Sequence, residues 1–110
     1  MTPADAIVVL VTAGSAEEGA RIGRALVEER LAACVNVVGP IRSIYRWEGA
    51  VEEAEEHLLV VKARAADLAA LDARVRALHS YDVPEVLALS VTGGAAGYLA
   101  WLDEATRRGG

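Results

Sequence analysis

The chain carries few of the side chains that usually coordinate transition metals. It has one cysteine, Cys34, and two histidines, His57 and His79. None of these shows the close grouping of Cys and His that marks a dedicated zinc or copper site. Cys34 lies in an apolar stretch and is predicted to be a buried, unreactive thiol. His57 is expected to be a solvated strand residue, and His79 to lie at a helix C-terminus, where a protonated imidazole is favourable.

Glutamates form the densest group of charged side chains, with four of them within residues 52–56. If residues 48–49 form a hairpin turn, Arg42 falls opposite Glu55. One interpretation is an edge strand that charge protects against unwanted pairing. The other is weak collection of hard cations, which prefer oxygen ligands. Both interpretations stay open at this point.

Composition limits the function further. The chain has 110 residues, a net charge of −5 and 54% apolar residues, of which 22 are alanine. No basic stripe is present, so nucleic acid is not an expected partner. No apolar run approaches the roughly 18 residues that a membrane span needs, so no membrane partner is expected. We therefore expect a single domain over residues 1–110, located in the cytoplasm.

The elements that position these residues follow the order β-α-β-β-α-β with a further helix at the end. Ser15 and Glu18 form a capping box that predicts the start of the first helix. Asp67 begins the second helix, and a short third helix carries Tyr98 and Trp101. Strands are predicted over residues 6–12, 34–47, 50–63 and 85–91. This order indicates an α+β fold of the ferredoxin-like, split βαβ plan: one antiparallel sheet with helices on one face.

The hairpin formed by residues 34–63 is long for a chain of this size. Fourteen strand residues extend about 46 Å at roughly 3.3 Å each. A compact chain of this length has a radius of gyration of about 13 Å. The hairpin must therefore bend at Gly39-Pro40 or project beyond its own domain. A projecting hairpin leaves unpaired backbone edges, and a neighbouring subunit is the simplest cover for them.

Residues 26–36 (LVEERLAACVN) and 43–49 (SIYRWEG) resemble the corresponding stretches of the CutA family of divalent-cation tolerance proteins. The resemblance covers about residues 6–103. It implies a homotrimer in which long hairpins join the sheets of neighbouring subunits. It also implies a part in the response to divalent metal ions, copper among them, by binding rather than by catalysis.

The resemblance implies only part of a metal site. In CutA relatives, copper has been attributed to a cysteine near the end of the first strand and to two histidines just before a tyrosine. The matching positions here are Val11, Leu78 and His79, followed by Tyr81. His79 is therefore the single metal ligand that the resemblance implies, for copper or another divalent cation.

A second set of residues that follows the family pattern combines aromatic rings with one lysine and one glutamate. These side chains could simply pack a subunit interface. Alternatively, they form an inter-subunit cleft in which Lys62 and Glu85 neighbour aromatic walls. The set comprises Tyr45, Trp47, Lys62, Tyr81, Glu85 and Trp101.

Two other functions fit the same topology. One is a trimeric small-molecule-binding signalling or adaptor protein that resembles the nitrogen-regulatory trimers. The other is a small hydrolase of the acylphosphatase type, which needs an arginine in the first strand-to-helix loop. Residues 12–15 contain no arginine, so the hydrolase ranks last. Fold alone does not choose among these uses.

Overall fold

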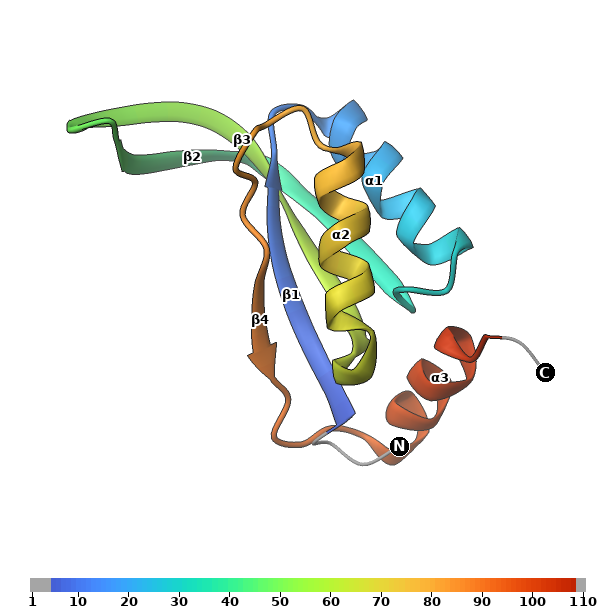
Figure 1. Ribbon diagram of the computed structural model, residues 1–110. Helices are drawn as coiled ribbons and strands as arrows, with labels where there is room; N and C mark the ends of the chain where they lie inside the picture. Colours follow the sequence, from blue (N-terminus) through green and yellow to red (C-terminus); the bar gives the residue numbers. More distant parts are fainter. Residues whose placement is uncertain (1–4, 109–110) are drawn as a thin grey trace.

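The computed structural model describes residues 5–108 and confirms the ferredoxin-like α+β fold (Figure 1). Residues 1–4 and 109–110, which the single-domain prediction includes, lie outside the described residues. The fourth strand is shorter than the predicted 85–91. The strands are β1 (Ala6–Ala13), β2 (Cys34–Trp47), β3 (Ala50–Arg64) and β4 (Leu87–Ser90). The helices are α1 (Ala16–Glu28), α2 (Leu68–Leu78) and α3 (Ala96–Thr106), with a 3-10 turn at Ala65–Asp67 before α2.

The four strands form one antiparallel sheet in the order β2-β3-β1-β4. Helices α1 and α2 cover one face of it (Figure 1). Side chains alternate along β1, so Val9 and Val11 are fully buried beneath the helices while Val8 and Leu10 point to the other face and are half-buried. Burial in β1 is therefore deeper on the helix-covered face.

Helix α1 begins as the capping box predicts, because the Ser15 hydroxyl accepts a hydrogen bond from the Glu18 amide at 3.1 Å. Its buried face contains Gly19 and Gly23 beside Ile22 and Leu26. A Cβ on Gly23 would lie only 3.0 Å from the Val35 side chain. The glycines thus let α1 lie close against β2 and β3.

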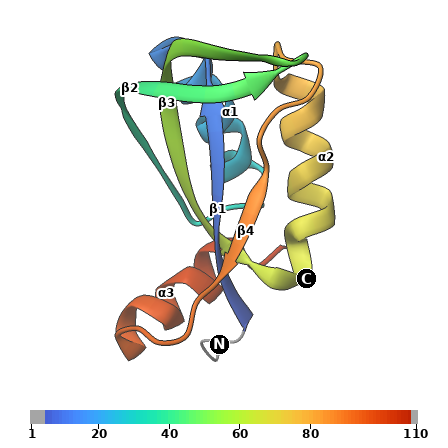
Figure 2. The ribbon, with the colours of Figure 1, turned by 90° about the vertical axis from the view of Figure 1, so that its left-hand side faces the viewer.

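The β2–β3 hairpin both bends and projects. The register of the two strands shifts between Val38 and Ile41, where Gly39 and Pro40 form a β-bulge at the position of the predicted bend. The described chain measures 46 × 26 × 22 Å. Figure 1 shows the hairpin leaving the body of the sheet, and Figure 2 shows it arching across the open face toward the loop before β4.

The face of the sheet turned away from α1 and α2 carries exposed apolar side chains, and Figure 2 views the molecule from that side. Leu87 and Leu89 on β4 are 55% and 47% exposed, and Val38 on β2 is 45% exposed. Helix α3 packs at one end of the sheet through Leu99 and Leu102, and these contact Ala6 and Ala33. Within the described residues, no helix is both long and apolar enough to span a membrane.

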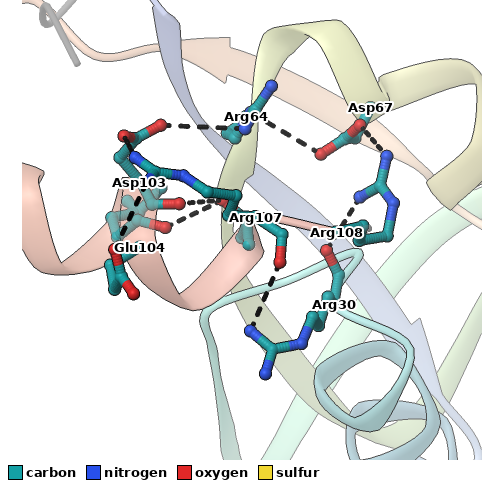
Figure 3. A network of polar contacts seen from close by, with 9 residues as sticks. Arg30, Arg64, Asp67, Asp103, Glu104, Arg107 and Arg108 are labelled. Carbon is teal, nitrogen blue, oxygen red and sulfur yellow. Dashed lines mark hydrogen bonds and ion pairs between the residues drawn. The ribbon is translucent and has the colours of Figure 1, made fainter. Parts of the chain in front are cut away.

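An ionic network fastens the end of the chain to its own body (Figure 3). The Asp67 carboxylate is 6% exposed, and Arg108 donates to it at 2.6 Å while Arg64 lies 3.8 Å away. Arg108 also donates to the Arg30 carbonyl at 2.9 Å, and Arg30 donates to the Arg107 carbonyl at 3.3 Å. The segment after α3 is thus tied to the end of α1 and the start of α2.

Candidate functional site: the groove beneath the hairpin

A groove of about 660 Å³ lies between the underside of the hairpin and the loop that joins α2 to β4. We call it the hairpin groove. It brings together segments that are far apart in the sequence: the end of β1, the outer half of the hairpin, and residues 80–85. Its lining residues are Thr12, Ser43, Ile44, Tyr45, Trp47, Glu56, Ser80, Tyr81, Asp82, Val83 and Glu85.

Strand register sets which hairpin side chains face the groove. Cα pairing places Tyr45 opposite Glu52 and Ile41 opposite Glu56, so Tyr45, Trp47 and Glu56 share one face of the hairpin. Arg42 pairs with Glu55 in register, as predicted. Its guanidinium, however, contacts Glu53 at 3.1 Å, and both side chains lie on the face of the hairpin turned away from Tyr45. The hairpin therefore turns aromatic rings and a carboxylate into the groove.

A hydrogen bond links the two walls of the groove. The Tyr81 hydroxyl donates to Glu56 at 2.8 Å, and Glu56 is only 7% exposed. Desolvation and this bond to Glu56 raise the pKa of Tyr81 to about 12. Desolvation and the Glu56 charge also raise the pKa of Glu85. The charge of Glu56 thus acts on a second carboxylate, Glu85, that lines the same groove.

Glu18 holds the loop that carries Tyr81 against the start of α1. The Ser80 amide donates to its carboxylate at 2.8 Å and the Gly14 amide at 3.1 Å. Desolvation acts to raise the pKa of Glu18, but the hydrogen bonds from Ser80 and Gly14 outweigh it and lower the pKa overall. In a standard capping box the Glu side chain bonds the N-cap amide; here it bonds Gly14 and a loop 62 residues away instead.

His79, the predicted metal ligand, has a buried imidazole with a hydrogen-bond partner at each ring nitrogen. Its side chain is 0% exposed; Nε2 lies 2.7 Å from the Thr12 carbonyl, and Nδ1 accepts the Tyr81 amide at 3.0 Å. These partners fit the neutral Nε2–H tautomer and occupy both ring nitrogens. Among residues 5–108, no three His, Cys, Asp or Glu side chains gather as a metal-ligand group. Both ring nitrogens of His79 are thus already engaged, and His79 as a metal ligand stays a prediction.

The structure brings four of the six predicted cleft residues to the hairpin groove: Tyr45, Trp47, Tyr81 and Glu85. Lys62 lies on the open face of the sheet, where its ammonium donates to the Asn36 side chain and, at 3.3 Å, to the Val60 carbonyl.

The other side chains considered for chemistry lie outside the groove. Trp101 is on α3, with its ring centroid 5.5 Å from that of Tyr98. Cys34 is half-buried rather than fully buried. The prediction of a solvated His57 is wrong, because its Nδ1 is buried, with no hydrogen-bond partner in the described chain, and its ring packs against Gly39 at the bulge.

The sequence matches a family model described as CutA1 divalent ion tolerance protein over residues 7–105. The divalent-cation tolerance protein CutA of Thermus thermophilus is 52% identical over 99 residues, which cover 90% of this chain and 96% of that protein. The chloroplastic protein CutA of Arabidopsis thaliana is 50% identical over 101 residues, or 92% of this chain. The chain spans only 56% of the Arabidopsis protein and 60% of a chloroplastic rice relative.

Solved structures show the same fold. The Cut A1 protein of Thermus thermophilus superposes with a TM-score of 0.91 at 51% identity, covering 93% of this chain and 99% of that one. CutA1 from Oryza sativa gives a TM-score of 0.91 at 48% identity, with 96% of each chain covered.

Proposed function

Because the chain belongs to the CutA1 divalent ion tolerance family, we propose that it is a homotrimer that serves the response to divalent cations by binding a ligand rather than by catalysis. The observation that carries the proposal is the hairpin groove. Tyr45 and Trp47 from the hairpin meet Tyr81 and Glu85 from a distant loop in one concavity. Converging aromatic and polar side chains in a groove are typical of a ligand site.

The projecting hairpin and the open sheet face support the trimer. In the described chain, β1 pairs with β3 no further out than His57. Beyond that point β2 and β3 pair only with each other, so the outer edges of the hairpin have no strand beside them. The open face presents Leu87 and Leu89 to solvent in a single chain. Neighbouring copies that cover both features would give the outer hairpin backbone partners and bury the exposed leucines.

The native mass spectrum of the protein purified from cells tests the assembly. We expect an intact particle of three 11.6 kDa chains. A monomer at micromolar concentration would contradict the trimer. Bound small molecules would be detected in the same spectrum as added mass, so the measurement also reports whether the protein carries a ligand in the cell.

We propose copper as the divalent cation. His79 is the single copper ligand that the family resemblance implies in this chain. His79 and Glu18, whose Nδ1 and carboxylate oxygen lie 3.8 Å apart, are the side chains that would hold a copper ion here, and Nδ1 would then no longer accept the Tyr81 amide. Equilibrium dialysis against Cu²⁺ tests this: we expect His79→Ala to retain less copper than the native protein. Circular dichroism of the variant checks that it is folded, and equal retention would remove His79 from the proposal.

A small-molecule signalling or adaptor trimer is the second candidate, because the groove has the size of a ligand pocket and lacks a clustered metal-ligand set within residues 5–108. A rise in unfolding temperature with ATP or ADP would favour it.

We place the whole chain, as one domain, in the cytoplasm. Cell fractionation tests that location, since relatives named chloroplastic show that members of the family also reach other compartments.

A further inference from the structure

We propose that the hairpin groove takes a small organic cation, an ammonium group carried on an apolar or aromatic body. The inference rests on the proposed function in one respect, that the groove is the ligand site. It adds the charge and the chemical class of the ligand, an organic cation rather than a metal ion.

The first argument is charge. Glu56, Asp82 and Glu85 line the groove, and its lining contains no Lys, Arg or His from the described chain. Glu56 is 7% exposed, and its hydrogen-bond partner at 2.8 Å is the neutral hydroxyl of Tyr81. A desolvated carboxylate that lacks a cationic partner favours binding of a positive charge.

The second argument is the apolar surface beside those carboxylates. The Tyr45 and Trp47 side chains are 43% and 50% exposed in the single chain, and Tyr81 is 38% exposed. Aromatic faces attract ammonium and guanidinium groups through the ring quadrupole, and they bury an attached hydrocarbon body. Tyr45 lines the groove from the hairpin and Tyr81 lines it from the loop, so the two walls face a common space.

The third argument separates an organic cation from a metal ion. A divalent metal needs several oxygen or nitrogen ligands within its own coordination sphere. Among the described residues, the acidic side chains of the groove do not gather into such a set. Separated carboxylates with aromatic walls suit a larger cation, whose ammonium group pairs with a carboxylate while its apolar body lies against the rings. The lysine of a neighbouring copy is a less favoured occupant, since Lys62 already donates to Asn36 and Val60.

Three probes of the same shape test the sign of the charge: benzylammonium, benzyl alcohol and benzoate, at equal ionic strength and a common, near-neutral pH. The chain has two tryptophans, so the indole N–H resonances of Trp47 and Trp101 report on the groove and on α3 separately. We expect benzylammonium to shift Trp47 saturably and to leave Trp101 unmoved. Benzyl alcohol should bind at least tenfold more weakly, and benzoate should give no shift.

Matched variants locate the site. Glu85→Gln should weaken benzylammonium binding at least fivefold, whereas Glu53→Gln, on the opposite face of the hairpin, should leave it unchanged. Trp47→Phe keeps an aromatic wall and should retain binding, read from the ligand's own resonances. Native mass spectra of each variant check that the assembly is intact.

Several results would overturn the inference. Equal binding of the alcohol and the ammonium would remove the role of charge. A response of Trp47 to Zn²⁺ or ATP, with none to benzylammonium, would keep the groove as the ligand site and reject an organic cation. Benzylammonium binding that arises only in Lys62→Ala would show that a neighbour's lysine fills the groove. If no probe moves Trp47 and the protein is monomeric, the proposed function fails as well.

Discussion

Glu18→Gln should lower the free energy of unfolding by about 2–3 kcal/mol at pH 7, at a fixed protein concentration. The native carboxylate accepts both the Ser80 and the Gly14 amides, and it is 7% exposed. A glutamine side chain can accept only one of these bonds, and its NH₂ group would face the other amide donor. The loop that carries Tyr81 would lose its anchor to α1, so the groove should loosen as well.

The effect of Glu18 should depend on pH. The pKa of Glu18 is lowered in the folded protein, so the folded state binds its proton less readily than the unfolded chain does. Its stabilising contribution is therefore complete above the unfolded pKa of 4.5 and is lost as the pH falls through the folded value. Urea unfolding at pH 7 and pH 3 should show the native protein and Glu18→Gln converging at the lower pH.

Glu17→Gln is the matched control for Glu18. It removes the same charge from the same first turn of α1, but Glu17 is exposed. Loss of its interaction with the helix dipole should cost about 0.3–1 kcal/mol. If Glu18→Gln costs no more than Glu17→Gln, the two amide bonds contribute nothing and the anchoring role of Glu18 is wrong.

The sequence predicted the fold well because local signals agreed with the global topology. The strand at residues 34–47 matches β2 at both ends, and the turn at 48–49 places Trp47 opposite Ala50 as expected. The fourth strand was predicted too long. Only Leu87–Ser90 pair with β1, and the register places Leu87 opposite Leu10. Residues 85 and 86 thus precede the strand: Glu85 lines the groove, and Val86 packs against the core. Hydrophobicity alone does not distinguish these two residues from the strand that follows.

The site was less accessible to prediction because its members meet only in three dimensions. In the sequence, Glu18 was noted as part of a capping box and Glu56 as one of four clustered glutamates. Both are buried, and Glu18 accepts a hydrogen bond from Ser80 while Glu56 accepts one from Tyr81. The alternation of β3 was the available signal for Glu56: it lies on the same face of the hairpin as Tyr45 and Trp47. Lys62 was grouped with these rings by resemblance, but within one chain it lies on the open sheet face.

Gly39→Ala should be the most damaging single-methyl change in the hairpin, with a loss of about 3 kcal/mol. Gly39 has φ +155°, and a Cβ there would lie 2.7 Å from Cδ2 of His57 and 3.2 Å from the Glu56 carbonyl. The His57 ring sits on a paired strand with its Nδ1 buried, so it has little room to move. The clash would push the outer hairpin away from the body and carry Tyr45 and Trp47 out of the groove. Urea unfolding measures the first effect, and a displaced Trp47 indole resonance with an unmoved Trp101 resonance measures the second.

Gly93→Ala separates this clash from the general cost of adding a methyl group to glycine. Apart from Gly93 itself and its two chain neighbours, no heavy atom of the described chain lies within 4 Å of a Cβ at Gly93, and its φ lies outside the left-handed region. The variant should unfold within about 0.5 kcal/mol of the native protein and keep both indole resonances in place. A Gly39→Ala protein as stable as Gly93→Ala, with Trp47 unmoved, would mean that the bulge does not fix the direction of the hairpin. The groove would then depend on the Tyr81–Glu56 bond, and loss of that bond in Tyr81→Phe would be the change that opens it.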